Sequence, residues 1–520
     1  MVTEQFIMKS LLLFLATLSL PAFSQRPKVY KAPKFESKWH LPSKHPDRIV
    51  LNLGQNPAKS ASVTWRTATD NASGVAEIAK ATSAPKFWRT AKSLKAAKYE
   101  LDGTKVPMAG IKSNYFSAKF TDLEPNTLYA YRVGNSGYWS EWIQFKTASE
   151  KPEKFSFLYV GDAQNFILEL WARVIRQGYK MAPHASFIIH AGDLVNHAHN
   201  EKEWTEWFEA GGWIHRTLPS IPIPGNHEYR PISKDSKDRE LAIQWVPQFT
   251  LPENGPDGLK ETVYYTDYQG VRIVALNTNK EIDKQLPWLE NVLSNNPNKW
   301  TVVTYHHPLY SASAGRNNVK LRNKLKPIFD QYKVDLALQG HDHSYARGRV
   351  APLEENRIDG VNKRDLTGTV YVVSVSGGKM YNLGDGWDDF GAKRDRGAEN
   401  TQLFQLITVD GDKLSYESYT ATGELYDAFD LMKHGKEGTI FVERKSEAIP
   451  ERRYTNSIPY YDQLPLDIKD KILAKYKGYS ISKTEILEKE GEILYAIEII
   501  TTKKRLNLVV DDKGKVVKSR

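Results

Sequence analysis

The chain contains no cysteine, which excludes several kinds of site at once. Disulfides, zinc fingers, iron–sulfur clusters, thiol nucleophiles and acylated lipoprotein anchors all require that residue. A metal in this protein must therefore be held by His, Asp, Glu, Asn or Tyr side chains.

Long apolar segments are also scarce. Residues 8–24 combine a Lys, a short apolar run from Leu11 to Leu20 and a small-x-small ending. That run is about half of what a membrane-spanning helix needs, and the order of features is typical of a secretory signal peptide. We therefore expect residues 1–24 to be removed, the mature chain to have no transmembrane segment, and the protein to be secreted, periplasmic or extracellular in a bacterium.

The excess of positive charge is modest for the length of the chain. The formal net charge is +10 over 520 residues, with 40% hydrophobic and 26% charged residues. This balance is typical of a soluble globular protein. It allows anionic ligands but does not predict nucleic-acid binding, so we expect no nucleic-acid partner. The length predicts two to four domains, at roughly 100–200 residues for each.

The first part of the chain has strand patterns. A basic, Pro-containing arm covers residues 25–45, and alternation typical of strands continues from about residue 46 to residue 147. In Ser62–Thr67 the alternation places Val63 and Trp65 on one face. The stretch LEPNTLYAYRV resembles the fibronectin type III hallmark, in which a Tyr bonds back across the corner of a β-sandwich. We expect such a sandwich within 25–147, the alternative being another antiparallel hairpin.

From Phe155 the pattern changes. Short apolar runs end in Gly-Asp or His, and amphipathic segments separate them, which predicts an α/β domain of layered sheets over residues 152–430. A polar linker is expected at 431–463. Residues 464–520 read as a helix followed by three or four strands, a small α+β module that resembles the PepSY-like modules of bacterial secreted proteins. The sequence does not identify a protein partner for it.

Histidines are concentrated in the α/β region. Ten of the 13 lie between His184 and His343, where an even spread would place about four. Five motifs with polar side chains follow its apolar runs. They are Gly161-Asp162, Gly192-Asp193, Gly225-Asn226-His227-Glu228, His306-His307-Pro308 and Gly340-His341-Asp342-His343. Each motif alone is weak, but five in this order at strand ends predict a functional site.

The residue types in these motifs favour a site for two metal ions. Without cysteine, divalent first-row metals prefer imidazole and carboxylate ligands, and a carboxylate such as Asp193 can bridge two ions. His341 and His343 are two residues apart, so both can face one pocket from a loop. Two ions about 3.5–4 Å apart can polarise a phosphoryl oxygen, generate hydroxide at neutral pH and hold both in-line oxygens.

The order of the five motifs resembles that of the calcineurin-like metallophosphoesterases. With the sandwich before it, the stretch 46–430 resembles a bacterial purple acid phosphatase. The resemblance implies a ligand set for each of two ions, iron, zinc or manganese. The first set is Asp162, Asp193 and His343, and the second is Asp193, Asn226, His306 and His341. His306 is preferred to His307 because the family's ligand lies two residues before the Pro.

The resemblance also implies that His227 is the general acid and contacts phosphate, the alternative being a His that orients a ligand. Three positions depart from the family pattern. Asn196 stands where purple enzymes have an iron-binding Tyr, which puts ferric iron and the purple colour in doubt. Gln164 stands where non-purple relatives often have a His, so each of these two residues is a candidate ligand or an outer-shell contact. The paired His after the HxP motif are missing, and Arg316 is a candidate to bind phosphate there.

We therefore expect a secreted phosphoesterase with two metal ions that hydrolyses small phosphate monoesters. The resemblance implies attack by a metal-activated hydroxide while His227 protonates the leaving oxygen. Two alternatives remain open: a phosphodiesterase with the same site, or a catalytically degenerate protein that binds glycans or envelope partners. All seven matched positions are retained, which favours an enzyme.

Overall fold

A computed structural model describes most of the chain. It covers residues 40–135, 137–350, 366–384, 386–435, 438–445, 450–452, 464–489, 492–501 and 504–519. The predicted signal peptide, 1–24, and most of the predicted basic arm lie outside the described residues. Within the described part, the helices are too short or too polar to cross a membrane.

The N-terminal domain is β-rich, as predicted, and consists of two sheets. One contains β1 (Asp47–Leu53), β2 (Ala61–Thr67), β5 (Ala97–Asp102) and β6 (Lys112–Phe120). The other contains β3 (Val75–Lys80), β4 (Lys92–Lys95), β7 (Leu128–Asn135), β8 (Tyr138–Trp139) and β9 (Ile143–Lys146). Val63 and Trp65 face a core shared with Tyr131. The Tyr129 hydroxyl accepts a hydrogen bond from the Glu124 backbone N–H at 2.9 Å. The finer likeness to fibronectin type III domains stays a prediction.

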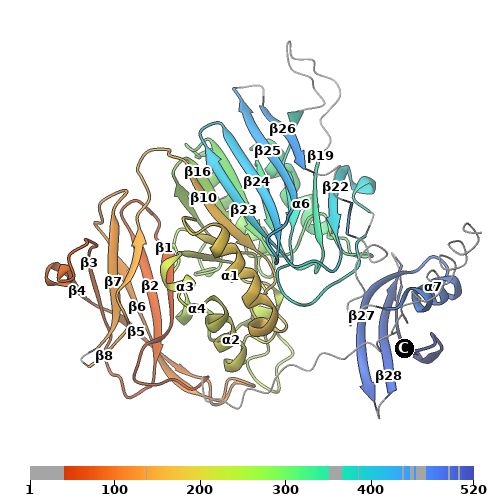
Figure 1. The fold of residues 1–520 in the computed structure, drawn as a ribbon, viewed down its shortest axis with the longest axis horizontal. Coiled ribbons are helices and arrows are strands. Elements are labelled where there is room, and N and C mark those ends of the chain that lie inside the picture. Colours follow the sequence, from red (N-terminus) through yellow and green to blue (C-terminus); the bar gives the residue numbers. More distant parts are fainter. Residues whose placement is uncertain are drawn as a thin grey trace, which may run out of the picture.

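The second domain is built on two larger sheets (Figure 1). The first contains β10 (Phe155–Val160), β11 (Ile188–His190), β12 (Ser220–Pro222), β20 (Leu366–Thr367), β23 (Leu403–Asp410), β24 (Lys413–Thr420), β25 (Leu425–His434) and β26 (Gly438–Lys445). The second contains β15 (Tyr264–Tyr268), β16 (Val271–Ala275), β17 (Trp300–Tyr305), β18 (Leu336–Gln339), β19 (Tyr345–Val350), β21 (Val370–Val373) and β22 (Ala392–Ala398). β12 pairs in parallel with β1, so one twelve-stranded sheet runs through both domains.

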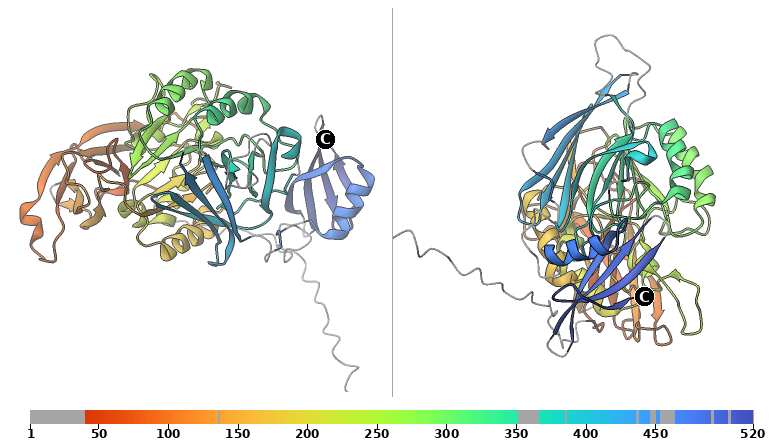
Figure 2. Two further views of the ribbon diagram at one scale, coloured as in Figure 1. Left: turned by 90° about the horizontal axis from the view of Figure 1, so that it is seen from above. Right: turned by 90° about the vertical axis from the view of Figure 1, so that its right-hand side faces the viewer.

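Helices cover the outer faces of these two sheets (Figure 2). They are α1 (Ala172–Met181), α2 (Glu201–Gly211), α3 (Ile214–Thr217) and α4 (Trp245–Gln248), and then α5 (Ile282–Ser294) and α6 (Val319–Gln331). α1 buries Val174, Ile175 and Gly178, a helical spacing, and Gly178 lies against Phe404 of β23. A short pair, β13 (Tyr229–Arg230) and β14 (Glu240–Leu241), stands apart from both sheets.

The polar stretch 431–463 is not simply a linker, which corrects the sequence interpretation. Strand β25 continues to His434, and β26 pairs with it as the next strand of the large sheet. Phe441 is buried against Phe429, with ring centroids 5.1 Å apart, and Thr439 is buried as well, while Val442 between Phe441 and Glu443 is exposed. The charged residues of β26 made the strand hard to recognise in the sequence. Because β26 pairs with β25, the sheet of the second domain extends past residue 430.

The C-terminal region consists mostly of strands, with one helix packed on a four-stranded sheet, and is not clearly α+β. It contains α7 (Leu466–Lys475), β27 (Ser480–Lys489), β28 (Glu492–Ile500), β29 (Arg505–Asp511) and β30 (Val516–Ser519). Ile468 and Ile472 of α7 pack on Tyr495 and Ile497 of β28 in a separate small core. The likeness of this region to PepSY-like modules stays a prediction.

Candidate metal centre

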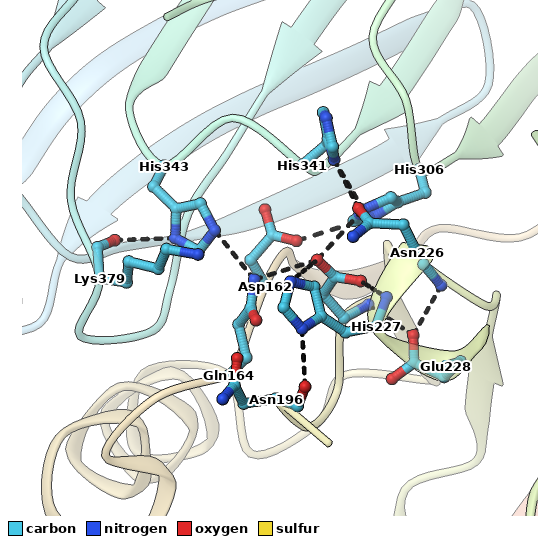
Figure 3. A network of polar contacts seen from close by, with 12 residues as sticks. Asp162, Gln164, Asn196, Asn226, His227, Glu228, His306, His341, His343 and Lys379 are labelled. Atoms are coloured by element: carbon cyan, nitrogen blue, oxygen red, sulfur yellow. Dashed lines mark hydrogen bonds and ion pairs between the residues drawn. The ribbon is translucent and has the colours of Figure 1, made fainter. Parts of the chain in front are cut away.

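The strand-end motifs meet at one place between the two large sheets (Figure 3). β10, β11 and β12 are parallel neighbours, and so are β17 and β18. Because the carboxyl ends of parallel strands share an edge, the residues that follow these strands are brought together. The sequence prediction that the motifs form one cluster therefore matches the geometry.

Asp193 lies at the centre of the cluster and is 1% exposed. Its Oδ2 is 3.3 Å from His306 Nε2 and 3.8 Å from His227 Nε2, and it accepts a hydrogen bond from Gln164 Nε2 at 3.0 Å. Its Oδ1 accepts the His227 backbone N–H at 2.8 Å. Burial opposes ionisation of Asp193, but the neighbouring His306 outweighs it and holds the pKa of this carboxyl well below its usual range.

Asp162 is buried, and its carboxylate lacks hydrogen bonds in the described part of the chain. Among the described residues, neither carboxylate oxygen of Asp162 has a hydrogen-bond partner, although its Oδ1 is 3.7 Å from His306 Nδ1. Burial raises the pKa of Asp162 well above its usual range, with His306 acting in the opposite direction. One ligand atom from each of Asp162, Asp193 and His306 lies within 4.8 Å of the others. A buried carboxylate with unused lone pairs beside an imidazole fits a divalent metal ion.

A second group of ligand atoms lies next to the first. Asn226 Oδ1 is 2.8 Å from His341 Nδ1 and 3.1 Å from His306 Nε2, and these two ring nitrogens are 3.2 Å apart. Ligands at about 2.0–2.1 Å from one ion are separated by roughly 3 Å. The three side chains thus have the spacing of a preformed coordination sphere.

The tautomers of two histidines leave one ring nitrogen of each for a metal. His306 Nδ1 donates to the Ala191 carbonyl at 2.8 Å, and His343 Nδ1 donates to the Lys379 carbonyl at 2.9 Å. A ring nitrogen facing a carbonyl must carry a proton, so Nε2 is the nitrogen of each ring that is available to a metal. At His306 burial is outweighed by Asp193, which raises the pKa to about 9, so an ion bound there would displace a proton from Nε2. Burial, and after it the charge of Lys379, lowers the pKa of His343 well below its usual range, which favours the neutral ligand form.

Glu228 holds the loop that carries Asp193, a role that the sequence analysis did not assign. Its carboxylate accepts the backbone N–H groups of Asp193 and Leu194 at 2.9 Å each and of Gly225 at 2.7 Å. Burial raises the pKa of Glu228 to about 8 against these donors. A Cβ on Gly225 would lie 2.1 Å from Asp193 Oδ1, so only glycine allows the two loops to touch.

Three of the candidate ligands have left-handed backbone conformations. The φ angles are +41° at Asp162, +50° at Asp193 and +72° at His341. Such conformations cost of order 1–3 kcal/mol each in non-glycine residues and gather at functional sites. The strain is consistent with a backbone shaped to aim these side chains inwards.

His227 is fixed by the backbone of Asn196. His227 Nδ1 donates to the Asn196 carbonyl at 2.7 Å, which turns Nε2 towards Asp193, and Arg230 donates to the same carbonyl. The Asn196 side chain instead lies 2.9 Å from His197 Nδ1. Asn196, a candidate ligand in the sequence, thus contributes its backbone carbonyl to the site, while its side chain contacts His197.

Arg316 and His307 lie at the edge of the cluster. Arg316 Nη1 donates to Asp342 Oδ1 at 2.9 Å and faces the His341 carbonyl at 3.4 Å. His307 is within 2.9 Å of Thr278 Oγ1 and forms a second possible ligand group with His306 and His341. The sequence predicts His306 rather than His307 as a ligand, and only the structure shows the His307 ring within reach of both His306 and His341.

Two sequence families match the two domains. Residues 46–147 match the purple acid phosphatase N-terminal domain, and residues 155–345 match the calcineurin-like phosphoesterase family. An uncharacterised protein of Mycobacterium tuberculosis is 26% identical over 313 residues, 50% of this chain and 57% of that protein. Fe(3+)-Zn(2+) purple acid phosphatase 12 of Arabidopsis thaliana is 26% identical over 286 residues, 50% of this chain and 59% of that protein.

Solved structures share the fold. Purple acid phosphatase PPD1 from yellow lupin seeds superposes with a TM-score of 0.60 at 19% identity, over 74% of each chain. PhoD gives a TM-score of 0.53 at 12% identity, over 81% of this chain and 95% of that one. The chain spans somewhat more than half the length of the curated relatives named above. Two regions of the chain are therefore similar to known families, residues 46–147 to the purple acid phosphatase N-terminal domain and residues 155–345 to the calcineurin-like phosphoesterases.

Proposed function

We propose that the protein is a secreted phosphatase that uses two metal ions to hydrolyse small phosphate monoesters. The observation that carries this proposal is Asp162, a buried carboxylate with unpartnered oxygens in the described structure, beside Asp193 and His306. Burial of an ionised carboxylate without a hydrogen bond costs free energy, and a bound cation would offset that cost. Secretion rests on the sequence of residues 1–24.

The ions would be held by the side chains of five strand-end motifs. The first ion would bind Asp162, Asp193 and His343, and the second would bind Asp193, Asn226, His306 and His341. When bound, such a pair lowers the pKa of water and polarises a phosphoryl oxygen. Asp193 Oδ2 lies 3.3 Å from His306 Nε2 of the second set, and one Asp193 oxygen lies within 4.8 Å of an Asp162 oxygen of the first set, which supports its role as the bridge.

His227 is the residue of the chain best placed to move a proton. Its Nδ1 is held by the Asn196 carbonyl, so Nε2 is the nitrogen that faces the cluster. A proton carried on Nε2 would pass to the leaving oxygen of the ester as the P–O bond breaks. The ring is part-buried, and its side chain is 19% exposed.

Positive charge at the edge of the cluster supports an anionic substrate. The charges of Lys379 and Arg316 act on the pKa of His343, after burial, in the direction that keeps its ring neutral. Lys379 lies beside His343 (Figure 3), and Arg316 Nη1 lies 3.4 Å from the His341 carbonyl while it also pairs with Asp342 at 2.9 Å. A phosphate monoester carries up to two negative charges, against one for a diester, and gains more from this field. Relatives with acid phosphatase names support the same substrate class.

The direct test is hydrolysis of p-nitrophenyl phosphate by the purified mature protein, before and after treatment with a chelator. We expect turnover that chelation removes and that zinc, manganese or ferrous iron restores. Bis(p-nitrophenyl) phosphate is the matched diester control. Faster cleavage of the diester would correct the substrate class, and absence of chelator-sensitive turnover on both esters would refute the enzyme.

A further inference from the structure

Gln164 lies at the first ion's side of the cluster, two residues after Asp162, and is fully buried. Its amide Nε2 is 3.0 Å from Asp193 Oδ2 and 2.9 Å from His343 Nε2. Its Oε1 has no hydrogen-bond partner within the described parts of the chain. The amide is thus a buried polar group with one atom satisfied and one atom unused (Figure 3).

The two atoms that face this amide both carry lone pairs. His343 Nδ1 donates to the Lys379 carbonyl, so His343 Nε2 is an acceptor, and Asp193 Oδ2 belongs to a carboxylate. A group between two such acceptors must be either an N–H donor or a cation. Without an ion, the NH₂ end of Gln164 fills this place. An ion at this place would be held by these lone pairs, and the amide could then offer its oxygen in place of its NH₂ group.

The geometry repeats that of the second ion's site. Asn226 Oδ1 lies 2.8 Å and 3.1 Å from two ring nitrogens of the second ligand set. The Gln164 amide lies 2.9 Å and 3.0 Å from two atoms of the first set. Each set therefore has one side-chain carboxamide at the separation expected of ligands that share an ion.

We propose that Gln164, through its carbonyl oxygen, completes the ligand set of the first ion, and that Asn196 does not. This inference rests on the proposed two-metal site. The side chain of Asn196 is held by His197, whereas Gln164 is already in contact with two first-ion ligands. A neutral carboxamide also stabilises a trivalent ion less than an anionic ligand does, so the first site suits a divalent ion.

Metal titration by calorimetry tests the inference without relying on turnover. Metal-free mature protein is titrated with Zn²⁺, and Co²⁺ is used in parallel for its absorption spectrum. Gln164→Ala should weaken one of the two sites by at least the roughly 10–100-fold that loss of an outer-shell partner costs. It should also change the cobalt spectrum. Asn196→Ala, the matched control that keeps the Asn196 backbone, should leave both affinities unchanged.

A second variant covers the case in which Gln164→Ala fails to fold. Gln164→Glu keeps the size of the side chain and adds an anionic oxygen, so it should tighten the same site, a result that misfolding does not produce. Unchanged affinity and cobalt spectrum in both Gln164 variants would overturn the inference, whatever the activity. Two bound ions with weakened binding in Gln164→Ala, but without ester hydrolysis in the wild type, would support the ligand and refute the phosphatase.

Discussion

Replacement of His227 by Ala separates proton transfer from metal binding. The His227 imidazole donates from Nδ1 to the Asn196 carbonyl and is not one of the ligands proposed for either ion. The contact that shapes Asp193 is the backbone N–H of residue 227, at 2.8 Å, which Ala keeps. The variant should therefore retain its metal. It loses one hydrogen bond to the Asn196 carbonyl, a stability cost of about 0.5–1.5 kcal/mol.

The rate should fall by roughly 10²–10⁴-fold for alkyl phosphates, the usual contribution of a positioned proton donor. The loss should shrink for p-nitrophenyl phosphate, whose leaving group departs with little help from a proton. The assay is kcat/KM over a series of esters with leaving groups of increasing pKa, with metal content measured on the same samples. His227→Gln is the control that keeps a polar side chain but no titratable proton, and it should behave like Ala. An equal loss for every leaving group would refute the role as general acid.

Three further predictions concern other residues. Asp193→Ala should abolish turnover and lower bound metal from about two ions per chain towards one or none, as measured by mass spectrometry, and two retained ions would show that the bridge is misassigned. Wild-type protein loaded with iron and oxidised should show no absorption band near 500–600 nm, where the family resemblance places a tyrosinate–iron band, because Asn196 replaces the Tyr; a purple protein would contradict this. Burial lowers the pKa of His215 to about 3, so between pH 6.5 and 3 the unfolded chain binds a proton that the folded chain does not. The His215 contribution to stability should be intact above pH 6.5 and fall by at most ~1.4 kcal/mol per pH unit below it. Chemical unfolding of His215→Phe should show a smaller decline, and equal slopes would contradict the assignment.

The position of the site could be predicted from the sequence because polar residues directly follow the apolar runs that form its strands. Continuous apolar runs ending in Asp162, Asp193 and His306 are buried strands with polar ends, and parallel pairing brings such ends together. The β-rich first domain was visible for a similar reason, since Val63 and Trp65 alternate with polar residues. These patterns involve residues close together in the chain, so they can be recognised in a single sequence.

What the sequence missed depends on contacts between distant segments. Glu228 belongs to a sequence motif, but the motif does not show that its carboxylate holds the Asp193 loop through the backbone N–H groups of Asp193 and Leu194. The choice between Asn196 and Gln164 needed the direction of each side chain, which spacing does not encode. Strand β26 was missed because its apolar run is only three residues long, Ile440 to Val442, and is followed by charged residues, one of which, Glu443, pairs with the buried Arg347.

The most direct test of the account is the metal content of the mature protein, measured by mass spectrometry together with p-nitrophenyl phosphate turnover on the same samples. The account predicts about two ions per chain, loss of ions and turnover together on chelation, and recovery of both when divalent ions are returned. Turnover that persists after the ions have been removed, or a protein that takes up no ions at all, would contradict it.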